Sequence, residues 1–525
     1  MQRRDFLKSS VALAAAADLG LMKAHGLVRA HNWSKYDFGS GPEVTDRLNQ
    51  GPFPQYPPDN AIPGDEVVMS TTPTDDVVPN YGKGLITYIT ADMGTEEIKS
   101  DDVNRAIEEL VRFPLGQQVY VRPTWREVQQ RPGKLELAEY LKVTFDLAQK
   151  NNKRVGLRVQ MSAPDYTHAP ALPDFVLNRV PKVDLILSGN EDRAAAQRYL
   201  NNPHARYQPR FDDPFFQDAF RELVGLLAAE FNGSPHIEFI DTFMYGFWGE
   251  GHTWPFSNNP FPDYQTAERT WIRMLEMQLE QFSKTPLLTN TQPDYSRVGN
   301  SELLDHSVRS NNWIRSDTIF IENEQIEALS NRPPWIGALL EQPLPGKPPE
   351  MQQSEEGIAP AENMIAHVMD IGANYWSLWN FHQISPANLA AYYEAYQPAF
   401  DRINRRIGYR VRPSFIWSYE DSGYLGIIIG FANDGIAGVP GVLRVSIVSP
   451  EGQLLKSGCL DPGYPVPGKI RQAQFVLPAG TKFQGLKLKA EIEVKGMRYP
   501  VRWACHQKLN DDGSLTLRPN LRQQV

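Results

Sequence analysis

The chain has 525 residues and a mass of 59.4 kDa, with 41% hydrophobic and 22% charged residues. Because single hydrophobic cores stop growing near ~250–300 residues, this length predicts more than one domain. The formal net charge of −9 and the pI near 5.7 argue against a nucleic-acid partner, which selects a basic surface. After the N-terminus no apolar run is long enough to span a bilayer, so the composition is typical of a soluble globular protein.

Residues 1–30 have the composition of an export signal. The stretch "QRRDFLKSSVALAAAADLGLMKAHG" begins with positive charge and continues with an apolar run that is too short to cross a membrane. Arg3 and Arg4, followed by Phe6 and Leu7, resemble the twin-arginine signal that exports folded proteins. We therefore expect a periplasmic or secreted protein, with an amphipathic first helix as the alternative.

Cysteine and histidine usage argues against a disulfide framework and against zinc. Cys459 and Cys505 are the only cysteines, so the fold does not rest on several bridges, and a single bridge between them is left open. The sequence has no CxxC, no HExxH and no His/Cys cluster at ligand spacing. No cofactor is expected, while a structural Ca²⁺ in the Asp-rich loops and the oligomeric state are left open.

After the expected export signal, the first predicted segment is extended. Residues 31–80 are rich in Pro, Gly, Asn and Asp, which favour turns and block long helices. From residue 81 to residue 408, short apolar runs alternate with amphipathic helical patterns. The expected helices lie at 100–113, 135–152, 214–233, 267–282 and 388–406, and the expected strands at 84–90, 117–123, 153–161, 236–250, 286–292, 307–313, 335–342 and 373–381.

This alternation predicts a (β/α)8 TIM barrel over residues 81–408. A doubly wound open sheet is the alternative, although "GLITYITADMG" lacks the Gly-rich phosphate turn typical of that fold. Residues 409–525 instead show short strands separated by Gly, Pro, Asn and Asp turns, which predicts a smaller all-β sandwich. We expect this sandwich to pack against the barrel rather than to bind a ligand.

Two isolated glutamates, Glu250 and Glu341, are placed at the ends of the fourth and seventh predicted strands, where barrel enzymes assemble their sites. Glycoside hydrolysis requires two such carboxylates, one to protonate the leaving oxygen and one to attack the anomeric carbon or activate water. Indoles near Glu250 are expected to raise its pKa by desolvation and make it a general acid/base, with Glu341 as the nucleophile. The alternative is that each glutamate pairs with an arginine such as Arg122 or Arg158.

Two other glutamates, Glu322 and Glu324, compete for these roles but are expected to open a helix, where acids are common. The remaining strand ends are rich in amides, guanidiniums and indoles. Sugars match this chemistry, because hydroxyls take planar hydrogen-bonding partners and pyranose faces stack on rings. The expected substrate-binding residues are Arg122, Trp125, Tyr166, Trp248, His252, Asn290, Asn312, Trp313, Trp376, Trp379 and His382.

The barrel portion resembles the clan of retaining β-glycosidases, whose acid/base Glu ends strand four and whose nucleophilic Glu ends strand seven. The stretch "VYVRPTWREVQQRPGKLELAEYLKVTFDLAQKNNKRVGLRV" is similar to the β-galactosidase-like members of that clan. More narrowly, "YGFWGEGH", "RIGYR" and "FANDGIAG" resemble exported bacterial proteins with a C-terminal domain of unknown function, the DUF4832 type. This resemblance implies a TIM barrel that cleaves a sugar substrate, with Glu250 and Glu341 in the two roles.

One position departs from the clan pattern, because Gly249 stands where an Asn usually precedes the acid/base. Either Asn290 or Asn312 then contacts the 2-hydroxyl of the sugar, or the mechanism is inverting. The sequence predicts a glycoside hydrolase that cleaves β-linked sugars, with retention expected and inversion left open. The alternative is a carbohydrate-binding barrel without catalysis. Sugar identity, linkage and exo or endo action are left open.

Overall fold

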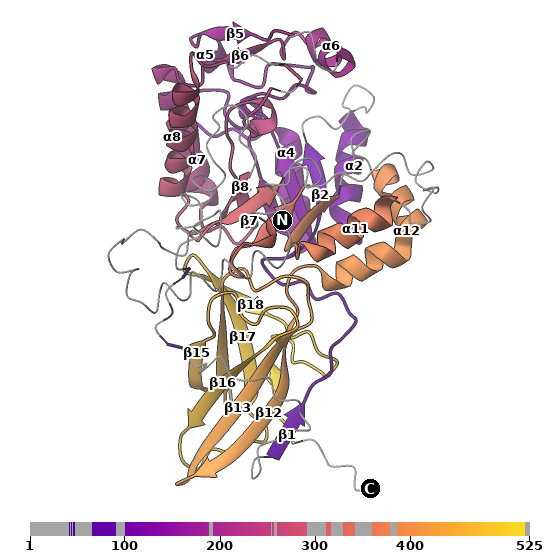
Figure 1. Ribbon diagram of the computed structural model, residues 1–525, viewed down its shortest axis with the longest axis vertical. Coiled ribbons are helices and arrows are strands. Elements are labelled where there is room, and N and C mark those ends of the chain that lie inside the picture. The colour runs from indigo at the N-terminus through magenta and orange to yellow at the C-terminus, as the bar shows by residue number, and fades with distance from the viewer. Residues whose placement is uncertain are drawn as a thin grey trace, which may run out of the picture.

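The computed structural model describes most of the barrel and the sandwich (Figure 1). The predicted export signal at residues 1–30 lies outside the described residues, as does most of the segment 31–65. The same holds for Glu322, Glu324, Trp379 and His382. The described residues are 41, 42, 44, 46, 47, 66–90, 100–187, 193–253, 255–256, 260–290, 311–316, 329–341, 360–378 and 386–519.

Eight parallel strands close into a barrel, which confirms the predicted fold class. Every neighbouring pair is parallel, and the last strand returns to the first, with Tyr375 opposite Gly84. In order around the barrel the strands are β2 (Gly84–Thr90), β3 (Gln118–Arg122), β4 (Val155–Leu157), β7 (Ile237–Asp241), β8 (Leu287–Asn290), β9 (Trp313–Ser316), β10 (Ala338–Leu340) and β11 (Tyr375–Leu378).

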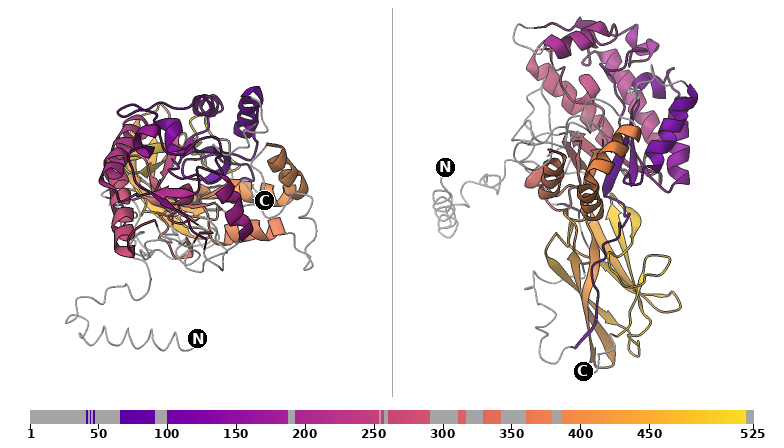
Figure 2. Two further views of the ribbon diagram at one scale, coloured as in Figure 1. Left: turned by 90° about the horizontal axis from the view of Figure 1, so that it is seen from above. Right: turned by 90° about the vertical axis from the view of Figure 1, so that its right-hand side faces the viewer.

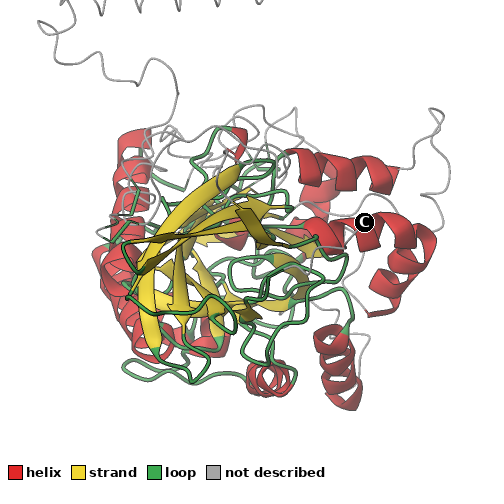
Figure 3. Cartoon of the chain, turned by 90° about the horizontal axis from the view of Figure 1, so that it is seen from below, coloured by secondary structure: helices red, strands yellow, loops and turns green. Residues whose placement is uncertain are grey.

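Helices lie around the outside of the strands (Figure 3). Their starts follow local sequence signals: Asp213 accepts hydrogen bonds from two backbone amides of the first turn after it, and Pro214 occupies the first helical position. Asp263 caps the next helix by accepting from Thr266 N. The long helices are α2 (Ser100–Arg112), α4 (Glu139–Lys150), α7 (Pro214–Phe231), α8 (Tyr264–Gln281), α11 (Pro360–Asp370) and α12 (Pro386–Arg406).

Side chains alternate between the barrel interior and the helix layer, as the period of two in a strand requires. Tyr375 belongs to the core cluster inside the barrel, whereas its neighbour Trp376 packs with the helices. Gly156 supplies no side chain because a Cβ there would meet the Phe239 ring at 2.3 Å. The interior is therefore filled by large rings from neighbouring strands, and the polar residues at the strand ends lie above this packed layer.

Two of the predicted strands have different bounds in the structure. The fourth strand ends at Asp241 rather than continuing to Glu250, because the chain turns at Gly246, which has a φ of 85°. The sixth begins at Trp313 rather than ending there, and Asn311, with a φ of 56°, marks the turn before it. The predicted residues 307–310 lie outside the described residues.

An insertion between β4 and α7 was not predicted from the sequence. It carries α5 (Asp174–Leu177), β5 (Lys182–Asp184), α6 (Arg193–Asn201) and β6 (Tyr207–Pro209), beyond the C-terminal ends of the barrel strands (Figure 1). We call residues 162–187 and 193–213 the cap. A small core joins the cap to the loop after β7, through Leu185, Tyr199 and Phe247 among others.

The C-terminal strands form two antiparallel sheets that share one core, as predicted for a sandwich. The first sheet is β1 (Glu66–Ser70), β12 (Val411–Asp421), β13 (Tyr424–Asn433) and β16 (Ile470–Leu477), so a strand from the expected lead-in segment joins it. The second is β15 (Leu454–Cys459), β14 (Val442–Val448), β17 (Lys487–Val494) and β18 (Met497–Val501), with β19 (Leu515–Thr516) beside β17. Cys459 and Cys505 are both free and buried.

The sandwich lies beneath the barrel, at the N-terminal ends of its strands (Figure 2). Tyr81 of the barrel stacks on Tyr499 of the sandwich with ring centroids 3.6 Å apart. Lys495 Nζ donates a 2.8 Å hydrogen bond to Asn312 Oδ1. The sandwich therefore packs against the barrel. Among the described residues, no helix is long and apolar enough to cross a membrane.

Candidate functional site

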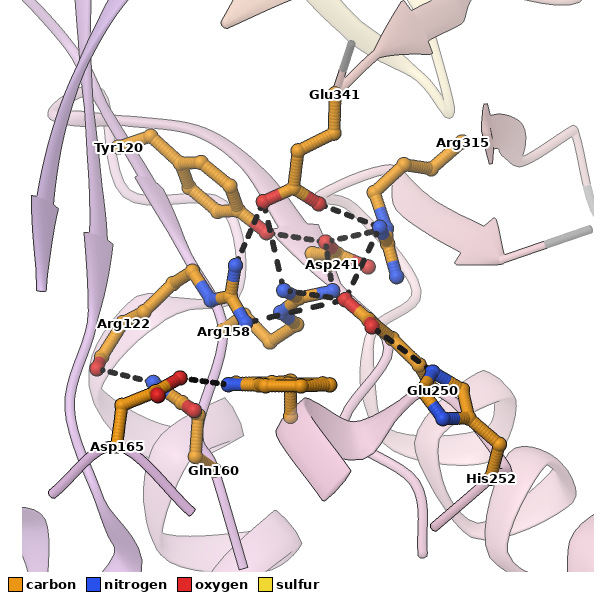
Figure 4. Close-up of polar contacts among 11 residues, drawn as sticks. Tyr120, Arg122, Arg158, Gln160, Asp165, Asp241, Glu250, His252, Arg315 and Glu341 are labelled. Carbon is orange, nitrogen blue, oxygen red and sulfur yellow. Dashed lines mark hydrogen bonds and ion pairs between the residues drawn. The ribbon is translucent and has the colours of Figure 1, made fainter. Parts of the chain in front are cut away.

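Charged side chains converge inside the barrel at the C-terminal ends of its strands (Figure 4). Arg122 is the last residue of β3, and Asp241 is the last residue of β7. Arg158 comes directly after β4, Arg315 lies within β9, and Glu341 directly follows β10. Each is at an inward position of the strand alternation, so the five side chains share the space above the core rings.

Glu341 is fully buried and held by guanidiniums. Arg122 Nη1 donates to its Oε1 at 2.7 Å, and Arg315 Nη1 donates to its Oε2 at 2.5 Å. Arg158 Nη2 lies 3.5 Å from Oε1. Charge-assisted bonds to both oxygens fix the carboxylate in one orientation. The arginine pairing that the sequence left as an alternative is therefore present in the structure.

Glu250 lies in the loop after β7, immediately after the short 3-10 helix η3 (Phe247–Gly249). The loop is folded tightly: Phe247 N donates to His252 O at 2.7 Å. At Gly246, φ is 85° and ψ is −179°, and an added Cβ would lie 2.7 Å from the backbone of His252. Trp248 has a φ of 54°, which is rare for a bulky residue. The backbone is thus bent to bring Glu250 back over the barrel mouth.

The two oxygens of Glu250 have different partners (Figure 4). Oε1 is 3.0 Å from Arg158 Nη2, 3.6 Å from Arg315 Nη1 and 3.8 Å from Arg122 Nη2. Oε2 lies 3.4 Å from His252 Nε2. One oxygen therefore faces the arginines and the other faces the imidazole.

The pKa of Glu250 is lowered, which corrects the expectation that it is raised. Burial raises the pKa, but the attraction of Arg158, the hydrogen bond with His252 and the charge of Arg315 together outweigh it. The expectation considered only the desolvating rings nearby. The arginines come from strands far away in sequence, so their effect on Glu250 follows only from the fold.

The two glutamates approach the same nitrogen. Arg158 Nη2 is 3.0 Å from Glu250 Oε1 and 3.5 Å from Glu341 Oε1, so these two oxygens are at most 6.5 Å apart, the sum of the two distances. A spacing of more than 10 Å would have excluded a shared reaction centre, because glycosidase carboxyl pairs lie about 5–9.5 Å apart. The fold therefore brings both predicted carboxylates to one place.

Asp241 and Tyr120 complete the cluster, and neither was among the predicted site residues. The Tyr120 hydroxyl donates a short hydrogen bond to Asp241 Oδ2, which also lies 2.9 Å from Arg315 Nε and 3.5 Å from Arg158 Nη1. Burial raises the pKa of Asp241, and Arg315 and Arg158 oppose that rise. Three guanidiniums thus face three carboxyl groups in the cluster.

A signal for the missed residues exists in the sequence. In "VGLRV" the apolar residues 155, 157 and 159 alternate with Arg158, and in "WIRS" Arg315 shares the parity of Trp313. A charged residue near a strand end, at one of the alternate positions that face the barrel interior, predicts a side chain in the barrel mouth. Asp241 was overlooked because the fourth strand was expected to continue beyond it.

Several of the predicted substrate-binding residues lie at or near the mouth. Arg122 and His252 contact the glutamates directly. The Trp248 indole donates from Nε1 to Asp165 Oδ2 of the cap at 3.2 Å and is half-buried. Tyr166 is a half-buried cap residue, and Asn290 is the buried last residue of β8, opposite Arg315 in the neighbouring strand.

Four predicted binding residues lie elsewhere. Trp125 is buried against the Phe216 and Phe220 rings of α7, because it begins the short helix α3 (Trp125–Val128) instead of lining the mouth. Trp376 faces outward and stacks on Phe400 of α12. The other two are at the opposite end of the barrel, since β9 begins where it was expected to end; these are Asn312 and Trp313.

No protein-family model matches the sequence, and no curated protein is significantly similar to it. Among solved structures the chain is similar to endo-glycoceramidase II from Rhodococcus sp. in a cellobiose-like imidazole complex, with 11% identity, 78% of this chain and 100% of that chain covered, and a TM-score of 0.34. It is also similar to GH5_18 from Streptomyces cattleya in complex with GlcNAc, with 11% identity, 63% and 83% covered, and a TM-score of 0.37. Likenesses at this level do not assign the chain to a family.

Proposed function

We propose that the chain is a glycoside hydrolase acting on β-linked sugars, with Glu341 as nucleophile and Glu250 as general acid/base. The observation that carries the proposal is the convergence of both buried glutamates on Arg158 at the C-terminal end of the barrel. Their facing oxygens are at most 6.5 Å apart, the sum of 3.0 and 3.5 Å to the shared nitrogen. This bound favours the retaining spacing of about 5–5.5 Å over the inverting spacing of about 6.5–9.5 Å.

The proposed reaction has two steps. The Glu341 carboxylate forms a bond to the anomeric carbon while the bond to the leaving oxygen breaks, and the leaving oxygen takes a proton from the Glu250 carboxyl. Water then attacks the anomeric carbon, gives its proton back to Glu250 and releases Glu341. Arg122 and Arg315 hold the nucleophile in a fixed orientation, so little side-chain ordering remains for the reaction step.

A second candidate function is carbohydrate binding without catalysis. The lowered pKa of Glu250 favours this alternative, because a general acid must carry a proton before it can donate one. On this alternative the three arginines and three carboxyl groups are a balanced structural cluster, and the cap and barrel mouth bind a sugar that is not cleaved.

Aryl β-glycosides of several sugars separate the two functions. We expect wild type to hydrolyse at least one of them, and both Glu250→Gln and Glu341→Gln to lower kcat by about 10²–10⁴-fold. Glu139→Gln, at an exposed position on α4, is the matched control and should keep the wild-type rate. A fluorinated sugar that traps the glycosyl-enzyme should add its mass to the peptide containing Glu341. No hydrolysis by wild type, with oligosaccharide binding retained, would establish the second candidate instead.

A further inference from the structure

The loop that carries Glu250 also places the His252 imidazole beside Glu250 Oε2, the carboxylate oxygen that the ion pairs with the arginines do not use. The ion pairs from Arg122, Arg158 and Arg315 to Glu250 are all made through Oε1. Oε2 faces His252, whose Nε2 lies 3.4 Å away. Because guanidiniums crowd Oε1, a proton on this carboxyl is accommodated at Oε2, beside the histidine.

The position of His252 is set by the backbone. Its carbonyl accepts a hydrogen bond from Phe247 N at 2.7 Å, and Gly246 leaves room for its peptide unit. Its ring lies 5.7 Å from the Trp248 ring, measured between centroids. The side chain of His252 is 11% exposed and that of Glu250 is 5% exposed, so the imidazole is the more accessible member of the pair.

The charged groups that surround this pair come from several strands. Arg122, Arg158 and Arg315 contact Glu250, Glu341 shares all three arginines, and Asp241 contacts two of them. From the cap, Asp165 accepts from the Trp248 indole that packs beside His252. Among these residue types only histidine has an ordinary pKa, about 6.5, close to neutrality. Histidine is therefore the residue type in this set whose charge is expected to respond to pH near neutrality.

We propose that His252 shares one proton with Glu250 and so supplies the proton that the leaving oxygen receives. This inference rests on the proposed function. In the first step the shared proton moves from the imidazolium to Oε2 and from there to the leaving oxygen. The bond between the anomeric carbon and the leaving oxygen breaks as Glu341 bonds to that carbon. In the second step the water oxygen bonds to the anomeric carbon, the bond to Glu341 breaks, and one proton of the water returns to the pair through Oε2. His252 acts through Glu250 and is thus a positioning and proton-sharing residue.

The first test compares the pH dependence of kcat/KM for two aryl glycosides. One carries a poor leaving group, which needs protonation, and the other carries 2,4-dinitrophenol, which does not. For the poor leaving group we expect wild type to lose rate at alkaline pH, and we expect His252→Gln to lower kcat/KM at least tenfold and to abolish that alkaline loss. With 2,4-dinitrophenol the variant should stay within about threefold of wild type, since acid catalysis contributes ~10²–10⁴-fold only where it is needed.

Glutamine keeps a hydrogen-bond donor near Oε2 but cannot carry a titratable proton. If His252 had only a structural role, His252→Gln would retain the wild-type rate and pH profile, and that result would overturn the inference. His236→Gln, an exposed histidine before β7, is the matched control and should leave both profiles unchanged. Loss of activity in Glu250→Gln and Glu341→Gln alongside an unchanged His252→Gln profile would leave the proposed function standing and remove only the inference.

The second test does not depend on activity. The His252 imidazole is titrated by NMR in wild type and in Glu250→Gln, with His252→Gln used to assign its signal. Loss of the carboxylate should lower the midpoint of the His252 titration by about one pH unit, because an opposite charge nearby favours the imidazolium. Identical midpoints in the two proteins would show that no proton is shared, whether or not the chain hydrolyses glycosides.

Discussion

At the scale of single residues, the interior of this protein holds charges that are compensated to very different degrees. Arg158 is fully buried, but its guanidinium faces Glu250, Glu341 and Asp241. Lys83 is also fully buried, at the start of β2, and among the described residues its ammonium has no hydrogen-bond partner. Removing the charge of Arg158 would leave three carboxyl groups facing only two guanidiniums, those of Arg122 and Arg315. Removing the charge of Lys83 instead relieves a desolvation cost.

Lys83→Met is expected to stabilise the protein at neutral pH. Burial, with a smaller contribution from Arg410, lowers the pKa of Lys83 from 10.5 to about 7. The unfolded chain therefore keeps this proton up to about pH 10.5, and the folded chain releases it near pH 7. Lys83 therefore lowers the free energy of unfolding by its full amount below pH 7, and this destabilisation disappears as the pH rises to about 10.5. Near pH 7 the variant should gain roughly 2–4 kcal/mol in the free energy of unfolding, measured by chemical denaturation.

Lys142→Met on the exposed face of α4 is the control for this measurement. Its ion pair with Glu139 is solvent-exposed, so the change should stay below about 0.5 kcal/mol at every pH. Equal pH dependence of unfolding in wild type and Lys83→Met would contradict the assignment of this cost to Lys83.

At the scale of elements, the ends of the predicted strands identified Glu341, but only the alternation of side chains along a strand distinguishes inward from outward residues. Glu341 was predicted because "IGALL" is a core strand and the next residue comes directly after it. Trp376 was misplaced because the alternation of side chains along the strand was not considered. Tyr375 faces the interior, so the next residue faces α12. The fold of the Glu250 loop could not be predicted, because it depends on contacts with the cap, such as the bond from Trp248 N to Ser162 O.

Gly246→Ala is expected to displace the loop that carries Glu250. The φ of 85° and ψ of −179° at this position are essentially restricted to glycine, and a Cβ would lie 2.7 Å from His252 N and O. We expect a loss of about 1–3 kcal/mol in stability, and at least a tenfold fall in kcat on the best aryl glycoside because Glu250 moves. Denaturation and steady-state kinetics measure the two effects.

Gly133→Ala separates backbone strain from displacement of the site. Gly133 also has a positive φ, 73°, but an added Cβ would meet nothing within 4 Å. This variant should lose about 1 kcal/mol and keep the wild-type kcat. A Gly246→Ala protein with wild-type stability and rate would show that the loop does not depend on this backbone conformation.

At the scale of the whole molecule, the sequence predicted the layers but not how they join. Alternating strands and helices predicted the barrel, and regular turns predicted the sandwich. The participation of β1 in the sandwich could not be predicted, because its partner β12 is more than 300 residues away: Met69 lies opposite Ile416. Long-range pairing of this kind leaves no local pattern in either strand. No local sequence pattern predicts which residues form the contact between the barrel and the sandwich either.

That contact is expected to make the two parts unfold together. Tyr81 stacks on Tyr499, and the Arg154 guanidinium lies 5.3 Å from both ring centroids. Tyr409 donates from its hydroxyl to Tyr81 O at 2.7 Å, which ties the start of the sandwich to the same residue. Truncating an aromatic ring in such a packed position costs about 3 kcal/mol or more. The cost falls on the interface, since both rings belong to it.

Tyr499→Ala should therefore weaken the thermal cooperativity of the molecule as well as its stability. In calorimetry we expect wild type to show one unfolding transition and the variant to show two, with the sandwich and the barrel melting separately. Tyr424→Ala is the control, because Tyr424 is 50% exposed at the start of β13 and pairs with Asp421 of β12 within the sandwich, so this variant should keep a single transition. If Tyr499→Ala melted in one transition at the wild-type temperature, the stacked tyrosines would not couple the two parts, and the coupling would have to come from other contacts such as Lys495 with Asn312.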